Sequence, residues 1–236
     1  MIRSVHRYAD RASPELASEI RGFAGQEGRH AQAHERFTDV LRKQGVDVEP
    51  IVETCERVVR GGLERFAPPQ LCLAVTAAAE RFTAIVAQDV LGSAGAPFED
   101  PEVRRLMQWH ALEELEHKAV AFDVLQAVAP GYLLRAAGMA LAAPILGGIW
   151  FWTTRHLCAQ KGMSLLQLAR ELASVRDDAE RTGKPGLKPL VTGVFLRGIF
   201  DYLRPGFHPM DHDDTELIAS TLDRLTREGV IAASAE

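Results

Sequence analysis

Acidic and imidazole side chains gather in three short stretches, with a spacing that suits metal binding. Glu27 and His30 lie three residues apart, as do Glu114 and His117, so each pair forms a Glu-x-x-His motif. A helix places residues i and i+3 on one face, where one side chain can bridge two metals while the other binds one terminally. Glu80 follows a largely apolar run, where burying a charge is costly unless it is paired or metal-bound. We therefore predict that these five residues are metal ligands.

Further residues extend the two motifs along the same helix faces. His110 lies one turn before Glu114, which makes it a sixth candidate ligand, and His34 lies one turn after His30. Glu113 stands at the edge of the second face. We expect Glu113 and His34 to serve as catalytic bases beside the metal. The acids expected to be solvated, or to contact ligands rather than the metal, are Glu53, Glu56, Glu64, Glu113 and Glu116.

The donor set indicates which metals fit. Carboxylates and imidazoles without thiolates suit iron, manganese or zinc, and a bridged pair in a helical bundle favours two iron ions. Manganese and zinc are the alternatives, zinc in a hydrolytic site. Cys55, Cys72 and Cys158 are far apart and share no ligand spacing, so we expect reduced thiols in the cytoplasm. A single Glu-x-x-His is common on solvated helices, but two extended copies favour a metal site.

Caps, prolines and glycines predict the helices that position these residues. Ser13-Pro14-Glu15 begins a helix that ends at Gly45, and residues 69–91 form a helix that carries Glu80. Asp100-Pro101-Glu102 begins a helix that ends at Pro130-Gly131. The sequence contains no alternating strand pattern, so the predicted fold class is all-α. The other expected elements are a loop at 92–97, a helix from Pro50 to Gly61-Gly62 or Pro68-Pro69, and helices at 164–183, 188–203 and 214–229.

Composition bounds the organisation and the partners. The chain has 236 residues, 47% of them hydrophobic and 25% charged, which excludes a disordered chain. Its net charge of −5 argues against nucleic acid as a partner. We predict one helical metal-binding domain over 1–236, with a metal-bearing core at 13–129, an uncharged helical segment at 132–157 and C-terminal helices at 164–229.

The uncharged stretch 136–154 stands apart from the rest of the chain. It reaches the lower bound of about 17–25 residues for a bilayer span, and two tryptophans lie near one end. One alternative is contact with a membrane surface. The other is a buried hairpin or central helix, interrupted at Pro144 and Gly147-Gly148. The expected location is cytoplasmic, with membrane association as the alternative.

The polar segment 207–214 contains two histidines. A second metal site is one interpretation. The favoured one is a turn at Pro209 followed by a cap of the last helix by Asp213 or Asp214.

The runs IRGFAGQEGRHAQAH, TAAAERFTAI and WHALEELEHKAVAFDV resemble a bacterial family named as predicted metal-dependent hydrolases. The resemblance continues to residues 202–209 and so covers most of the chain. It implies hydrolysis at a metal site.

The ligand order is also similar to that of ferritin-like di-iron N-oxygenases such as p-aminobenzoate N-oxygenase. Those enzymes show Glu, Glu-x-x-His, Glu and His-x-x-x-Glu-x-x-His, and this sequence matches the last three elements. The resemblance implies a ferritin-like bundle with additional C-terminal helices. The first Glu has no counterpart, because Glu15 and Glu19 share the helix of Glu27. Three alternatives remain for this ligand. An acidic helix upstream supplies it, His34 or Glu113 completes the ligand shell of the metals, or the site holds less metal.

The leading functional hypothesis is a di-iron oxidoreductase that activates O2 on a small organic substrate. The alternatives are a hydrolase that uses a metal-bound water and a non-catalytic, membrane-associated helical protein. A homodimer is a further alternative for the assembly.

Overall fold

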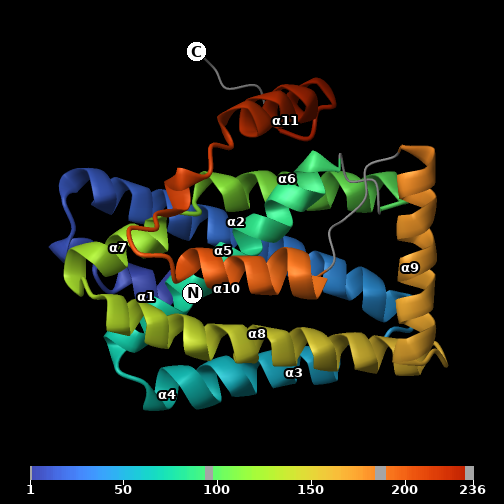
Figure 1. The fold of residues 1–236 in the computed structure, drawn as a ribbon, viewed down its shortest axis with the longest axis horizontal. Coiled ribbons are helices and arrows are strands. Elements are labelled where there is room, and N and C mark those ends of the chain that lie inside the picture. Colours follow the sequence, from blue (N-terminus) through green and yellow to red (C-terminus); the bar gives the residue numbers. More distant parts are fainter. Residues whose placement is uncertain (1, 94–97, 184–189, 232–236) are drawn as a thin grey trace. The chain divides into compact units, whose positions relative to one another are not determined.

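The computed structural model describes residues 2–93, 98–183 and 190–231, and within these ranges the chain forms helices and no strand. The predicted all-α class is confirmed. The helices are α1 Ile2–His6, α2 Pro14–Lys43, α3 Glu49–Glu56, α4 Glu64–Phe66, α5 Pro69–Gly92, α6 Pro101–Glu116, α7 Val120–Val128, α8 Tyr132–Gln160, α9 Leu165–Thr182, α10 Arg197–Tyr202 and α11 Thr215–Arg227 (Figure 1). Short 3-10 turns span Ala9–Arg11 and Pro209–Asp211, and π-helical segments span Arg57–Leu63 and Leu190–Leu196.

Local capping fixes the start of both motif-bearing helices. The Ser13 hydroxyl accepts a hydrogen bond from the Leu16 amide at 3.2 Å, at the start of α2. The Asp100 carboxylate accepts from the amides of Glu102 and Val103 at 2.8 and 3.0 Å, at the start of α6. Both caps satisfy amides that have no partner inside the helix, so both predicted starts are confirmed.

The predicted helix from Asp100 to Pro130 is wrong in one respect, because it breaks after Glu116. His117 adopts φ −106° and ψ 10° at the C-terminus of α6, and α7 begins only at Val120. The break contains Lys118, whose ammonium group bonds to residues almost 100 positions further along the chain. A tertiary contact therefore overrides a locally continuous helix pattern.

Two other predictions concern where helices break or end. The predicted interruption at Pro144 is wrong, because α8 continues through this residue and through Gly147-Gly148. Proline removes one helical hydrogen bond, and the long helical stretches on both sides tolerate this loss. The helical stretch that begins at Glu49 runs past Gly61-Gly62 and ends at Phe66, just before Pro68, so the second of the two predicted ends is the one that forms. Residues 94–97 of the predicted loop and 188–189 of the predicted helix lie outside the described residues.

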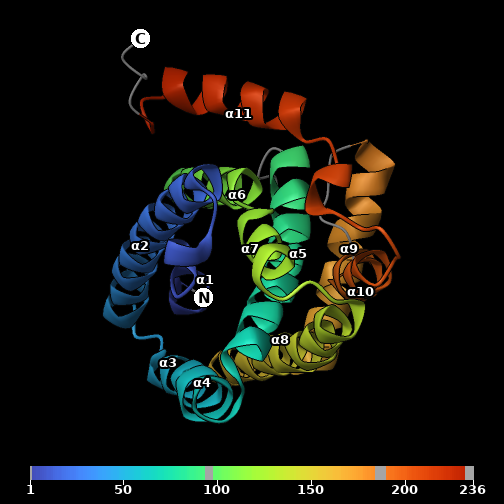
Figure 2. The same ribbon diagram turned by 90° about the vertical axis from the view of Figure 1, so that its left-hand side faces the viewer.

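The chain divides into two compact units, and the first contains Met1–Ala79 and Val120–Val175. In this unit α2 packs against α1 and α7, and α3 packs against α8, which runs beside it in Figure 2. α8 also approaches α5 closely, because a Cβ atom added to Gly138 would lie 2.4 Å from the carbonyl oxygen of Ala74. Only glycine allows this contact between the two helices.

The second unit contains Glu80–Ala119 and Arg176–Glu236. Here α11 packs on α6 (Figure 1), and α10 meets α5 where Gly198 lies against Phe82 and Ile85. The organisation of 1–236 as one metal-binding domain stays a prediction. The buried apolar cluster of this unit contains Ala84, Ala87, Val90, Leu91, Ala111 and Leu115.

Two helices of the described residues are long and apolar enough to cross a membrane, α5 and α8. In the most apolar stretch of α5, 78% of the residues are buried, against 22% in α8. Length and apolarity are weak evidence for a membrane span, because core helices of soluble proteins share both properties. The burial of α5 is that of a core helix, whereas the apolar stretch of α8 is mostly unburied. The chain outside these two helices is compatible with a soluble protein.

Candidate metal centre

The first Glu-x-x-His motif continues the buried face of α2. Ile20 and Phe23 are buried on this helix, and Glu27 and His30 follow at the spacing that keeps residues on one face. Oε1 of Glu27 lies 3.5 Å from Nδ1 of His30, whose ring is buried. The buried face of α2 therefore continues into the motif, with His30 buried and Glu27 partly buried.

His34 lies one turn further along α2 and is exposed to solvent. The packing around its ring lowers the pKa of His34, and the neighbouring His30 lowers it further, whereas Glu27 has the opposite effect. A lowered pKa favours the neutral imidazole, the form that can accept a proton. Its predicted role as a catalytic base stays a prediction.

The second motif lies at the end of α6, in the second unit. Nε2 of His110 lies 3.4 Å from Oε1 of Glu114, which is buried, and His110 is partly buried. Glu113 is buried beside them. The buried residues Ala111 and Leu115 hold this part of α6 in the apolar cluster of the unit, so the carboxylates are placed by core packing.

Glu80 of α5 meets His117 in the same unit. Oε2 of Glu80 lies 3.3 Å from Nδ1 of His117, and the two residues are 1% and 2% exposed. His117 stands at the break after α6, outside the regular helix. The contact therefore joins a ligand candidate in a core helix to one in a connecting segment.

The three carboxylate–imidazole distances fit shared metal binding. They lie between 3.3 and 3.5 Å, whereas hydrogen bonds between charged partners are about 2.7–2.9 Å long. Two ligand atoms each about 2.1 Å from one ion, at an angle of about 105°, are about 3.3 Å apart. The described residues contain a group that could hold a metal ion, formed by Glu27, His30, Glu114 and His117. The chain therefore offers a possible His/Glu metal site. The donor atoms do not identify which metal binds there.

Neither the cysteines nor the exposed acids add ligand atoms to this donor set. Burial raises the pKa of the thiols of Cys55 and Cys72, which disfavours the metal-binding thiolate. All three cysteines are free. The acids that are exposed, as expected for solvated residues, are Glu53, Glu56, Glu64 and Glu116.

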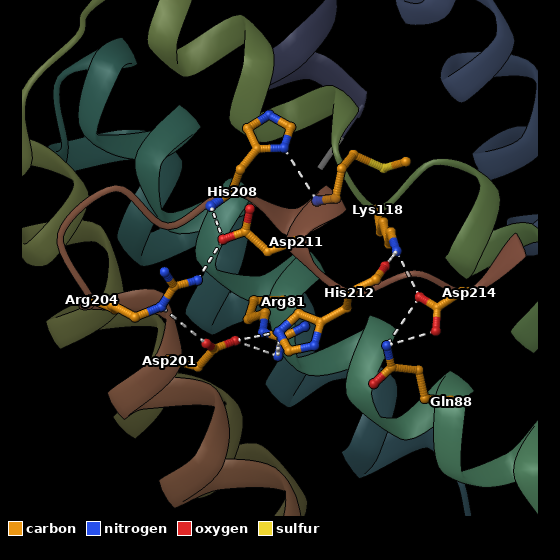
Figure 3. Close-up of polar contacts among 10 residues, drawn as sticks. Arg81, Gln88, Lys118, Asp201, Arg204, His208, Asp211, His212 and Asp214 are labelled. Carbon is orange, nitrogen blue, oxygen red and sulfur yellow. Dashed lines mark hydrogen bonds and ion pairs between the residues drawn. The ribbon is translucent and has the colours of Figure 1, made fainter.

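The segment 207–214 binds protein groups through its polar side chains (Figure 3). Nδ1 of His208 accepts from the Met210 amide, and His212 Nε2 lies 2.7 Å from Asp201 Oδ2. The segment joins no metal-binding group of the described chain, so the alternative of a second metal site gains no support.

Pro209 begins a 3-10 turn, as predicted, and the carboxylate of Asp213 accepts from the Thr215 amide at the start of α11. This hydrogen bond lowers the pKa of Asp213. The carboxylate of Asp214 makes no capping bond and is used elsewhere. Of the two predicted caps, Asp213 is therefore the one that forms.

Two buried cations were not expected from the sequence. Arg81 and Lys118 are 2% and 3% exposed, and each directly follows a candidate ligand, Glu80 or His117. Burial lowers the pKa of Arg81, and the nearby Asp201 opposes this effect. The sequence contains no signal for their roles, because their partners lie 94–120 residues away.

Comparison with known proteins gives one match. A family model described as predicted metal-dependent hydrolase matches residues 1–213, a range that includes every candidate ligand. No curated protein and no solved structure matches the chain.

Proposed function

The chain belongs to the family of predicted metal-dependent hydrolases, and we propose that it is a metalloenzyme with a dinuclear iron centre that activates O2 on a small organic substrate. A ferritin-like bundle with additional C-terminal helices is part of this proposal. The proposed ligands are Glu27, His30, Glu80, His110, Glu114 and His117.

The contact between Glu80 and His117 carries the proposal. Dinuclear sites in helical bundles combine a Glu-x-x-His motif from each of two helices with a lone Glu from other helices. α2 and α6 supply the two motifs, and Glu80 is a lone buried Glu on α5 that lies 3.3 Å from the second motif. Four residues suffice for one ion, and Glu80 and His110 add donors for a second.

Iron in this centre would supply the redox chemistry that O2 requires. The protein residues have separate tasks in the proposal. The six ligands would hold the metal in a largely buried site, which would limit the access of water. Glu113 is buried beside the second motif, and His34, whose pKa is lowered, lies near the first, so each would serve as a base that accepts a proton from a bound substrate.

Hydrolysis is the second candidate, favoured by the description of the family. In this case zinc or manganese would lower the pKa of a bound water and make it a nucleophile. Glu113 or His34 would then accept the proton of that water. The same ligands serve both candidates, so the metal and its reaction with O2 distinguish them.

The test loads the metal-free full chain with Fe(II) under anaerobic conditions and then admits air in an oxygen electrode. We expect O2 uptake in proportion to bound iron, and none from metal-free protein. A full iron complement without O2 uptake would contradict the oxidoreductase. Cleavage of an ester or phosphoester by the zinc- or manganese-loaded chain, absent without metal, would then support the hydrolase.

A further inference from the structure

We propose that Lys118, Arg81 and Asp214 are positioning residues, which hold His117 against Glu80 through a network anchored in residues 201–214. This inference rests on the proposed function, because it concerns the ligands of the proposed centre. The network lies within the second unit and includes none of the six ligands (Figure 3).

Lys118 anchors the break after α6. Its Nζ donates to the backbone carbonyl of His212 and to Oδ2 of Asp214, both at 2.6 Å. His117, the preceding residue, is the C-cap of α6: its amide still donates to the carbonyl of Glu113, but its φ of −106° departs from helical values. The helix therefore holds the amide of His117 but not the backbone that follows it. The buried ammonium group therefore supplies the restraint that regular structure supplies elsewhere.

Asp214 carries this restraint to α5. Both of its carboxylate oxygens lie 3.0 Å from Nε2 of Gln88, which donates to them. Gln88 lies about two turns after Glu80 on the same helix. Lys118, Asp214 and Gln88 thus form a first link between the break and the helix that carries Glu80.

Arg81 provides a second link. Its Nη2 donates to Oδ2 of Asp201 at 2.6 Å, and Nε2 of His212 lies 2.7 Å from the same oxygen. The backbone carbonyl of His212 accepts from Lys118, so His212 connects the two cations. The guanidinium group also lies over the ring of Phe207, at 5.5 Å from its centroid.

The two links start from the residues that follow Glu80 and His117, so they tie together the backbones of both ligands. Buried ion pairs hold one geometry, because separating the partners leaves a charge in a medium of low polarity. Groups that orient metal ligands typically change metal affinity by about 10–100-fold when they are removed. The network therefore sets how well Glu80 and His117 are arranged before a metal binds.

The experiment compares the full chain with Lys118→Met, which removes the charge and keeps an extended side chain. Co(II) is titrated into metal-free protein, and the visible absorption of the bound ion reports both affinity and ligand geometry. We expect about 10–100-fold weaker binding and an altered spectrum in Lys118→Met, with recovery in Lys118→Arg. Lys161→Met, which removes an exposed cation at the end of α8, is the matched control and retains both properties.

A milder variant covers the case in which Lys118→Met does not fold. Gln88→Ala removes only the amide that binds Asp214, and we expect a smaller loss of Co(II) affinity in the same direction. Unchanged affinity and spectrum in folded Lys118→Met or Gln88→Ala would overturn the positioning role. A wild-type chain that binds no Co(II) would instead overturn the proposed centre, and this inference with it.

Discussion

Glu80 is the residue on which the proposed centre depends most. Its carboxylate is almost completely buried in a helix of apolar residues and lies 3.3 Å from the ring of His117. A buried carboxylate is costly unless a cation or a metal compensates its charge. A shared metal ion would compensate both side chains, and it would account for a distance that is long for a hydrogen bond.

We expect Glu80→Gln to weaken metal binding, because an amide cannot replace an anionic ligand. The expected loss is at least about 10-fold in affinity, with the metal content of dialysed protein falling by about half. Elemental analysis of wild type and variant measures it. Glu116→Gln, on the exposed side of α6, is the control and retains its metal. Equal metal content in Glu80→Gln and wild type would exclude Glu80 from the centre.

His34 gives the metal-free protein a pH dependence. Its pKa is lowered in the folded chain, whereas an unfolded histidine has a pKa of about 6.5. The unfolded state therefore binds more protons as the pH falls through this range, and folding stability decreases. We expect the free energy of unfolding to fall less between pH 7 and 5 in His34→Gln than in wild type. Urea denaturation at several pH values tests this, and parallel curves would contradict it.

At the scale of elements, the contact between α5 and α8 depends on a single glycine. Any side chain at Gly138 meets the backbone of Ala74, which cannot move away as a flexible side chain can. We expect Gly138→Val to lower the free energy of unfolding by about 1–3 kcal/mol or more. Gly148→Ala on the same helix meets nothing within 4 Å and should stabilise by about 0.5–1 kcal/mol. Chemical denaturation measures both, and equal effects would contradict the close approach.

Helix starts could be predicted from the sequence because their causes are local. Ser13 and Asp100 bond to amides two or three residues away, so the local sequence is enough to predict where these helices start. The break after Glu116 could not be predicted, since Lys118 is drawn to Asp214 by the tertiary fold. At Pro144 the local sequence predicts a helix break that does not occur, because the long helix α8 accommodates the proline.

The same division holds for the candidate site. Helical spacing predicted the pairs within α2 and α6, and both are close in the structure. Glu80 could be selected because a carboxylate that follows a long apolar run is unusual. The roles of Arg81 and Lys118 could not be predicted, because a cation beside a ligand is uninformative until its partners 94–120 residues away are known.

At the scale of the whole molecule, we expect metal binding to contribute to folding stability. Any ligand that binds only the folded state stabilises it, by about 2.7 kcal/mol when its concentration is 100 times Kd. For a chain of this length, that corresponds to a rise in Tm of about 5–10 °C. We expect chelator treatment to lower Tm by this amount and restored metal to reverse the change. An unchanged Tm in calorimetry would show that the folded chain does not bind metal tightly.

The metal content of the full chain, purified without chelators from cells supplied with iron, tests the central claim most directly. Elemental analysis of all transition metals is combined with the protein concentration from amino-acid analysis. The dinuclear centre predicts about two equivalents of iron per chain, reduced in Glu80→Gln and retained in Glu116→Gln. Less than about a tenth of an equivalent of any transition metal would contradict it, because a site of buried carboxylates and imidazoles should retain its ion through purification.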